Sequence, residues 1–411
     1  MCDSVHAMTT AAAPAPSGTT SFHLHVPQVE VDDLRARIRA TRLPGVLGDG
    51  SDERGFTTSE ARNLLEHWRS GFDWRAAEAE INSLDHVLVD VGTTTGQAGQ
   101  RVHLVRAGAD QATGAQQLPV VLIHGWPDSF LRYRHLLRPL TAAGHDVYLP
   151  SLPGFAFSDQ FDGPATVEAA AEALLAALAA LGVNRYAVHG GDWGSAVAEQ
   201  MAITAPHAVA ALHLTDVPWP HFFTVDREGA TPAEEAFFAA GDAWAAQAAY
   251  VSVQATQTTT LALALADSPL GMAAWWAEKY HAWSDAPVSW DEVLTQVCLT
   301  WFTHTEHSGM RYYAAMDDGS WDGGDNDDGA WSGDDGADAG DGAWGAKALQ
   351  PTAIAVFPAD IQTPPREYAA RAFPDLRRFT VMPRGGHYGA LEEPALLASD
   401  IGAFLADLSR T

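Results

Sequence analysis

The sequence predicts an α/β fold whose core is a mostly parallel, doubly wound sheet with an inserted helical lid. From residue 119 onward, short apolar runs such as PVVLIHG, DVYLPSLPG and RYAVHGG alternate with helical stretches such as VEAAAEALLAALAALG. Strands that alternate with helices are typical of a parallel sheet covered on both faces, with ligands at the carboxyl ends of its strands. The alternation stops between about residues 217 and 350, where patterns rich in Ala, Trp and Tyr predict inserted helices.

Helical segments and a hairpin are expected before this core. The stretch VDDLRARIRATRLPG places Leu34 and Ile38 on one helical face and ends at Pro44 and Gly45. SEARNLLEHWRSGFDWRAAEAEIN predicts a second, Trp-rich helical region. HVLVDVG and RVHLVRAG alternate apolar and polar residues, which indicates an antiparallel hairpin. After the insertion, TAIAVFP and RFTVMP return the chain to the sheet.

Two segments are expected to lack a packed structure. The opening MCDSVHAMTTAAAPAPSGTTS has neither the basic nor the continuous apolar region of a signal peptide, and it predicts a disordered tail. DDGSWDGGDNDDGAWSGDDGADAGDGAWG holds ten Asp and no basic residue, which predicts a solvated loop, and its spacing does not follow the calcium-loop pattern. The predicted division is a tail at 1–21, a wrapping segment with the hairpin at 22–115, core at 116–216, a lid at 217–350 containing the acidic loop 317–345, and core again at 351–411.

The composition limits which classes of binding partner and which cellular compartment are expected for this protein. With 24 basic and 52 acidic side chains, the formal net charge is −28, which argues against nucleic acid or an anionic membrane as a partner. Cys2 and Cys298 lie far apart in sequence, so a disulfide framework is not expected. No window of eighteen uninterrupted apolar residues predicts a transmembrane helix. We expect a soluble, cytoplasmic protein with a bacterial composition, and the sequence leaves open whether it is a monomer or a homodimer.

The stretch VHGGDWGSAVAEQ carries the clearest chemical signal. An apolar strand precedes it, an Ala-rich helix follows, and Gly190 and Gly194 flank Asp192 at the spacing of the strand-to-helix turn that presents a nucleophile. A carboxylate in this position suits displacement at a saturated carbon, because the ester formed there can be hydrolysed in a second step. The alternative is a structural role, since Asp is also a preferred residue at the start of a helix.

A histidine and an acid follow in the order that this architecture requires. His387 lies in the loop MPRGGHYGALEEP between a strand and the last helix, a suitable place for the base that activates water. Asp360 in AVFPADIQTPP follows a strand and is predicted to orient His387. Asp216 in LHLTDVP, at the end of an earlier core strand, is the alternative acid.

The stretch HGWPDS, residues 124–129, closes a further strand with a sharp turn. We expect the backbone amide of Trp126, with that of Trp193 after the nucleophile, to form an oxyanion hole for the ester carbonyl. A plain Gly-Pro turn is the alternative for this motif alone. Together with the turn at Asp192, the motif is much more specific.

These motifs resemble those of a known family, the epoxide hydrolases of the α/β-hydrolase fold, and within it the branch similar to the microsomal enzyme. The resemblance runs from about residue 22 to the end, apart from the acidic run. FHLHVPQVEVDDLRARIRATRLPG resembles the family's N-terminal segment, and HGWP, GGDWGS, FPAD and GGHYGALEEP match its oxyanion, nucleophile, acid and histidine motifs. Because the family accepts Asp or Glu as the acid, the resemblance favours Asp360 over Asp216.

The resemblance also implies two lid tyrosines that donate hydrogen bonds to the epoxide oxygen. The motif SGMRYYAAM selects Tyr313, with Tyr312 as the alternative, and the region around AQAAYVSVQATQ selects Tyr250. A phenol can donate a hydrogen bond while it stays neutral. The chain departs from the family where Ala314 and Ala315, instead of a charged residue, follow the second tyrosine.

The implied activity is hydrolysis of a small hydrophobic epoxide to a vicinal diol through an Asp192 ester, with no metal and no cofactor. A haloalkane dehalogenase is the nearest rival, because it shares the Asp turn, the histidine and the Trp after the nucleophile, but it has no need of a tyrosine pair. A non-catalytic binding protein of the same fold is the other alternative. The complete set of Asp192, Asp360 and His387 argues against that interpretation.

Overall fold

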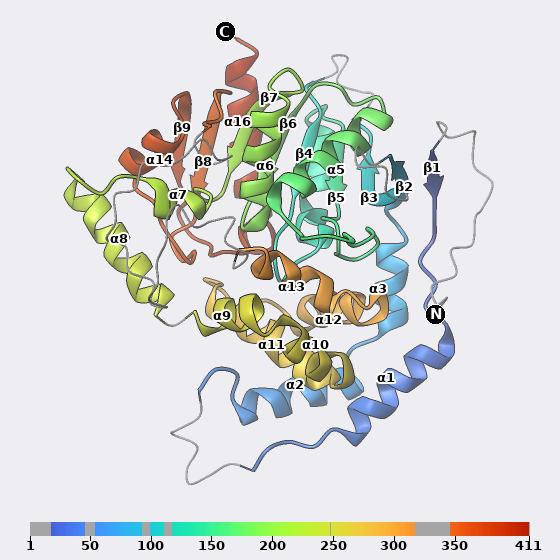
Figure 1. The fold of residues 1–411 in the computed structure, drawn as a ribbon. Helices are drawn as coiled ribbons and strands as arrows, with labels where there is room; N and C mark the ends of the chain where they lie inside the picture. Colours follow the sequence, from blue (N-terminus) through green and yellow to red (C-terminus); the bar gives the residue numbers. More distant parts are fainter. Residues whose placement is uncertain are drawn as a thin grey trace.

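The computed structural model describes residues 18–45, 54–92, 99–110, 117–246, 248–316 and 346–410. In this part of the chain a nine-stranded sheet has the strand order β1-β2-β3-β5-β4-β6-β7-β8-β9 (Figure 1). The pairings β1 with β2, β2 with β3 and β3 with β5 are antiparallel, and the others are parallel. The predicted hairpin and mostly parallel sheet are thus confirmed. The strands are β1 (Thr19–Ser21), β2 (Asp85–Val91), β3 (Gln100–Ala107), β4 (Val120–Ile123), β5 (Val147–Pro150), β6 (Tyr186–Gly190), β7 (Val209–Leu214), β8 (Thr352–Val356) and β9 (Leu376–Val381).

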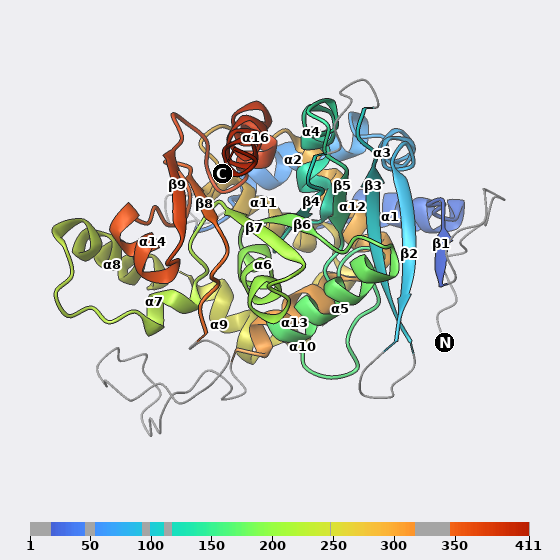
Figure 2. The ribbon, with the colours of Figure 1, turned by 90° about the horizontal axis from the view of Figure 1, so that it is seen from above.

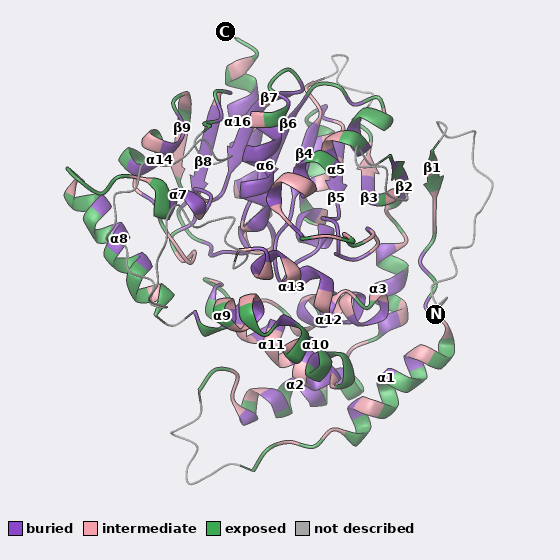
Figure 3. Ribbon diagram, viewed as in Figure 1, coloured by how far each residue is buried: buried purple, intermediate pink, exposed green. Residues whose placement is uncertain are grey.

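Helices cover both faces of this sheet. Figure 2 shows α5, α6 and α14 on one face and α4 and α16 on the other. Strands β4, β6 and β8 are buried along their whole length (Figure 3), which explains why their sequences are continuous apolar runs without alternation. The helices of the core are η2, a short 3-10 helix (Phe130–Leu136), α4 (Leu137–Ala142), α5 (Val167–Ala180), α6 (Trp193–Thr204), α14 (Arg366–Ala372), α15 (Gly389–Glu392) and α16 (Pro394–Leu408).

A helical insertion separates β7 from β8, and its described residues contain no strand. Figure 1 shows α9, α10, α11, α12 and α13 gathered as a layer along one end of the core. The insertion consists of α7 (Pro220–Thr224), α8 (Pro232–Ala245), α9 (Ala249–Thr256), α10 (Thr258–Asp267), α11 (Pro269–Ala282), α12 (Trp290–Thr303) and α13 (Glu306–Ala314).

The N-terminal segment packs against this insertion. Helix α1 (Gln28–Ala40) contacts α11, α2 (Thr58–Ser70) contacts α11 and α12, and α3 (Trp74–Ile81) contacts α12. The second predicted helical region is therefore two helices. They are separated because α2 ends at Ser70, with Gly71 as its C-cap, and the Asp73 side chain caps α3, accepting a hydrogen bond from the Arg75 amide at 2.9 Å.

The predicted N-terminal tail needs a correction at its end. Thr19–Ser21 form β1 and pair with β2, with Thr20 opposite Leu88, so the tail does not extend through residue 21. Backbone pairing with an exposed sheet edge orders this short polar segment, which the side-chain pattern alone does not indicate. Residues 1–17 of the predicted tail and the acidic run 317–345 lie outside the described residues.

Among the described residues, none of the helices has both the length and the apolar character needed to cross a membrane. Cys298 on α12 is buried with a free thiol, and burial raises the pKa of that thiol above its ordinary value. Cys2 lies outside the described residues.

We predict that Asn82, at the end of α3, anchors the extended segment before α1. Its side chain accepts a hydrogen bond from the Leu24 amide at 2.8 Å and donates one to the Leu24 carbonyl at 2.9 Å. Asn82→Ala should lower the free energy of unfolding by about 1–3 kcal/mol, because two backbone groups lose their partners. Urea denaturation measures the change. Asn184→Ala is the control, since that exposed side chain bonds only to the nearby Gly182 carbonyl, and an equal loss in both variants would contradict the anchoring role.

Candidate active site

Asp192 lies in the sharp turn between β6 and α6. Its backbone has φ 57° and ψ −136°, in the positive-φ half of conformational space that residues with a side chain rarely occupy. The Asp192 amide donates to the Asp216 carboxylate at 2.7 Å, and the Asp192 carbonyl accepts from the Ser195 hydroxyl at 2.7 Å. These contacts hold the strained backbone and place the carboxylate beyond the end of β6.

Glycines around the turn leave room for this backbone. A Cβ on Gly194 would lie 2.0 Å from the Ile123 carbonyl oxygen, and one on Gly190 would lie 2.2 Å from the Gly194 carbonyl oxygen. A Cβ on Gly125 would lie 2.1 Å from Asp192 Oδ1. The glycine spacing noted in the sequence is therefore a steric requirement of the turn.

The two carboxylate oxygens of Asp192 face different partners. Oδ1 accepts a hydrogen bond from the Trp126 amide at 2.8 Å, and the Trp193 amide also donates to the carboxylate. Oδ2 lies 3.7 Å from His387 Nε2. Burial raises the pKa of Asp192 above its ordinary value, although His387, the two amides and Arg132 favour the ionised form. The side chain makes no helix-capping hydrogen bond, so its contacts do not support the capping interpretation.

His387 and Asp360 are brought together by loops that follow β9 and β8. His387 Nδ1 lies 2.8 Å from Asp360 Oδ1, and both side chains are buried. Burial acts to lower the pKa of His387, but the charge of Asp360 and its hydrogen bond outweigh burial and raise that pKa above its ordinary value. Within the described residues, Nε2 makes no hydrogen bond. This nitrogen faces Asp192 and can accept a proton from a water molecule placed between them.

Asp216, the alternative acid, lies under the turn at Asp192. Its Oδ2 accepts a hydrogen bond from the Asp192 amide, and the Ser195 hydroxyl, which donates to the Asp192 carbonyl, favours the ionised form of Asp216. Burial, and then the nearby charge of Asp360, raise the pKa of Asp216 to about 7. The geometry thus gives Asp216 contacts that support the turn, the role expected from the sequence for whichever of the two candidate acids does not orient His387.

Tyr250 on α9 and Tyr313 on α13 reach the site from the insertion. Their ring centroids are 5.8 Å apart, and their side chains hydrogen-bond to each other. Tyr250 stacks on Trp126 with 5.4 Å between centroids, and Tyr313 meets Trp193 edge-on at 5.1 Å. Burial raises the pKa of both phenols, and the charge of Asp192 raises it further. Both hydroxyls therefore stay protonated and can donate.

Tyr312, the alternative to Tyr313, is directed elsewhere. Its hydroxyl donates to the Pro153 carbonyl at 3.0 Å, and its ring packs against Phe155 at 5.8 Å between centroids. Adjacent residues on a helix point about 100° apart, so only one member of the pair can meet Tyr250.

A buried charged network lies beneath the loop that carries His387, and it was not predicted from the sequence. Arg132 donates to Asp128 at 2.6 Å and to the backbone carbonyl of His387. Asp128 also accepts from the hydroxyl of Tyr280 on α11, whose ring stacks on Tyr388 at 4.2 Å. The network joins the loop at residues 124–129, the insertion and the loop that carries His387. Its only sequence signal is an Asp in HGWPDS followed four residues later by an Arg.

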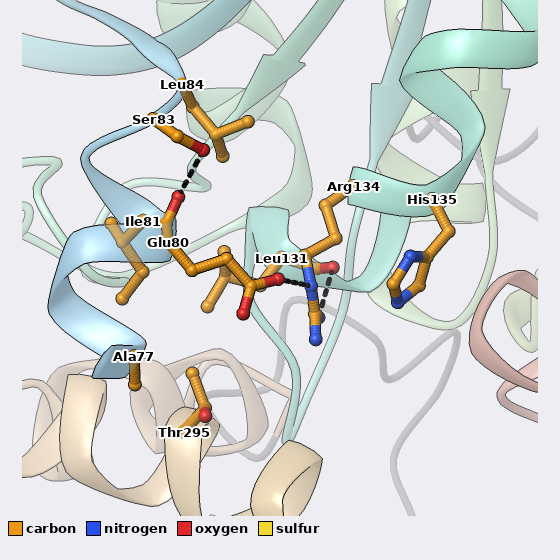
Figure 4. Close-up of a pocket in the computed structure, with 9 residues that line it drawn as sticks. All are labelled: Ala77, Glu80, Ile81, Ser83, Leu84, Leu131, Arg134, His135 and Thr295. Carbon is orange, nitrogen blue, oxygen red and sulfur yellow. Dashed lines mark hydrogen bonds and ion pairs between the residues drawn. The ribbon is translucent and has the colours of Figure 1, made fainter. Parts of the chain in front are cut away.

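A separate pocket lies between α3, η2 and α12 (Figure 4). None of the predicted site residues lines it, and its Arg134 is paired with Glu80 at 3.2 Å. Its lining consists of Ala77, Glu80, Ile81, Ser83, Leu84, Leu131, Arg134, His135 and Thr295. Within the described ranges, no three His, Cys, Asp or Glu side chains gather as a metal site would require.

Two family models match overlapping parts of the chain. The model for the epoxide hydrolase N terminus matches residues 19–133, and the model for the alpha/beta hydrolase fold matches residues 119–394, more than half of the sequence. A protein of Stigmatella aurantiaca named "Putative epoxide hydrolase" is 31% identical over 403 residues, which cover 93% of this chain and 84% of that protein. The chain belongs to the epoxide hydrolase family. The resemblance seen in the motifs is confirmed.

Other members of the epoxide hydrolase family share the whole organisation. Epoxide hydrolase 1 of Sus scrofa is 27% identical over 430 residues, which cover 95% of this chain and 89% of that protein. The crystal structure of juvenile hormone epoxide hydrolase from the silkworm Bombyx mori is similar in fold, with a TM-score of 0.81, 22% identity and 95% coverage of each chain. The similarity of fold thus extends over the N-terminal segment, the core and the insertion.

The steric role of Gly194 can be tested by adding one methyl group. Gly194→Ala should lower the free energy of unfolding by about 1–3 kcal/mol or more, because the added carbon collides with the Ile123 carbonyl. Thermal or urea unfolding measures the loss. Gly402→Ala in α16 is the matched control, since a Cβ there meets nothing within 4 Å and alanine favours helix. Equal stability of the Gly194 variant and the native chain would contradict the proposed clearance.

Proposed function

We propose that this protein hydrolyses small hydrophobic epoxides to vicinal diols through a covalent ester on Asp192. Membership of the epoxide hydrolase family supports the reaction, and the residues around Asp192 support the mechanism. The observation that carries the proposal is the position of Asp192, whose carboxylate lies between amide donors, His387 Nε2 and the buried tyrosine pair.

The first step opens the ring. Asp192 Oδ2 attacks one epoxide carbon from the face opposite the ring oxygen, and the bond from that carbon to oxygen breaks as the ester bond forms. Tyr250 and Tyr313 donate hydrogen bonds to the departing oxygen, which would otherwise leave as a poorly stabilised alkoxide. The raised pKa of both phenols supports this role, because a donor has to keep its proton until charge develops on the substrate.

The second step hydrolyses the ester. His387 Nε2 accepts a proton from water, and the resulting hydroxide attacks the carbonyl carbon of Asp192. The amides of Trp126 and Trp193, which already contact the carboxylate, stabilise the oxyanion. Asp360 holds His387 Nδ1 and stabilises the imidazolium that forms. Collapse of the intermediate releases the diol and restores Asp192.

The described contacts do not favour the alternative activities. A dehalogenase needs donors for a halide, whereas this site presents two phenol donors that suit an alkoxide oxygen. The ring of Trp126, whose amide contacts Asp192, lies 5.6 Å from the ring of Trp276 and 6.4 Å from that of Trp283, and these apolar side chains support an apolar substrate. The proposal includes action in the cytoplasm on a substrate that is not bound to nucleic acid or to an anionic membrane, since the formal net charge of −28 disfavours both partners.

A panel of styrene-type epoxides and haloalkanes separates the two reactions. We expect diol from the epoxides and little released halide, and we expect Tyr250→Phe with Tyr313→Phe to slow diol formation by about 100-fold or more, because the departing oxygen loses its donors. Tyr312→Phe is the matched control, since its hydroxyl bonds to Pro153. Halide release faster than diol formation, or full diol formation by the double variant, would refute the assignment.

The pH dependence of turnover should report on His387. The base has to be neutral, so the rate of ester hydrolysis should rise as pH increases through the raised pKa of His387. Asp360→Asn removes the charge that raises this pKa. The midpoint of the acid limb should then move to lower pH, and the maximal rate should fall by about 10²–10⁴-fold as the imidazole loses its orientation.

Asp216→Asn is the comparison that separates the two candidate acids. Asp216 contacts the Asp192 amide, so this variant should disturb the turn without moving the acid limb as far as Asp360→Asn does. Stopped-flow measurement of ester hydrolysis across pH gives both midpoints. A larger shift in Asp216→Asn than in Asp360→Asn would assign the orienting role to Asp216.

A further inference from the structure

Lys279 on α11 is a buried cation beside one member of the tyrosine pair. Its side chain is 10% exposed, and its Nζ lies 4.3 Å from the centroid of the Tyr250 ring. The rings of Trp283 and Trp275 lie 5.5 and 5.9 Å from the same nitrogen, and Glu278 forms an ion pair with it. The ammonium is therefore held among three aromatic rings and one carboxylate.

The burial of this lysine calls for a physical explanation. Removing an ammonium group from water is costly unless it gains compensating interactions. Ring faces carry partial negative charge and Glu278 supplies a full one, so the surroundings of Lys279 provide such compensation. The sequence contains one other lysine, Lys347, which is exposed and donates to the Arg371 carbonyl. Lys279 is thus the lysine whose charge can act on the site.

We propose that Lys279 is a positioning residue that acts through Tyr250, strengthening this phenol as a donor to the epoxide oxygen. The inference rests on the proposed function, in which Tyr250 assists ring opening. An ammonium over the ring face attracts the electron density of the phenol ring. That attraction also keeps the ring in place against Trp126, on which it stacks.

The attraction between the Lys279 ammonium and the Tyr250 ring is expected to become stronger in the transition state of the first step. As the carbon–oxygen bond breaks, Tyr250 shifts its proton toward the epoxide oxygen and negative charge builds on the phenol. A cation attracts a ring that carries developing negative charge more strongly than it attracts a neutral one, so Lys279 stabilises the transition state more than the ground state. In the second step the charge on Tyr250 does not change until the ester has been cleaved. Lys279 therefore stabilises the ester and the transition state of its hydrolysis equally, and the rate of that step should not depend on Lys279.

Protons and charge balance over the cycle. Tyr250 gives its proton to the epoxide oxygen as the Asp192 ester forms, and its phenolate charge then lies beside Lys279. One water proton passes through His387 to the diol oxygen that leaves Asp192. The other is released from the regenerated Asp192 carboxyl group and restores the phenol.

The test measures the two steps separately. Rapid-quench single turnovers with styrene oxide, followed by mass spectrometry of the Asp192 peptide, give the rate of ester formation and the rate of its hydrolysis. Lys279→Met, which keeps much of the side-chain length and removes the charge, should slow ester formation by about 2- to 30-fold and leave hydrolysis unchanged. Lys279→Arg should recover most of the loss, because it restores the cation.

Two further variants keep the test independent of folding effects. Lys347→Met, the matched removal of an exposed lysine, should change neither rate. Glu278→Gln removes the compensating carboxylate, so ester formation should stay equal or become faster, since Lys279 then acts on Tyr250 with less opposition. Equal slowing of both steps in Lys279→Met, or slower ester formation in Glu278→Gln, would overturn the inference.

A double variant separates this inference from the proposed function. In a Tyr250→Phe background, Lys279→Met should cause no further loss of ester formation, and an undiminished loss there would show that Lys279 acts elsewhere. If the native protein forms no diol from any epoxide, the proposed function fails. If it forms diol and Lys279→Met forms the ester at the native rate, only the role of Lys279 fails.

Discussion

The strained turn at Asp192 is the constraint on which the rest of the site depends. A residue with a side chain at positive φ persists only where its surroundings compensate for the strain. Gly125, Gly190 and Gly194 leave the space, since a Cβ on any of them would come within 2.0–2.2 Å of a neighbouring atom. Asp216 holds the amide of the same turn. Backbone packing therefore determines where the carboxylate lies, and the other groups are arranged around that position.

The core and the helical insertion form one packed unit around this carboxylate. The His387 amide donates to the Trp283 carbonyl of the insertion at 2.7 Å, and Tyr280 of α11 donates to Asp128 in the loop after β4. Trp126, whose amide contacts Asp192, stacks on Tyr250. Because these contacts cross the boundary and bury the site, charges inside interact more strongly than they would at the surface, and the pKa values of Asp192, His387 and Tyr250 are raised.

Local sequence patterns predicted much of the site. They could not decide between neighbouring or similar candidates for the same role at particular positions. The spacing of glycines around Asp192 and the order of Asp192, Asp360 and His387 were sufficient to nominate the nucleophile, acid and base. Asp216 stayed open as an acid because its separation from His387 depends on how β7 and β8 lie in the sheet. Tyr312 and Tyr313 were hard to separate, since their difference is a rotation about α13 relative to a distant helix.

The sequence by itself was enough for the alternation of strands and helices, the turn at Asp192 and the family, because these depend on short-range patterns of apolar residues and glycine. Only the folded chain brings Tyr250, Tyr313 and His387 to one carboxylate, since their distances depend on packing between segments far apart in sequence. The same is true of Lys279 and of the pair Asp128 and Arg132. A buried charge has no periodic signature, and its role depends on which rings and carboxylates surround it after folding.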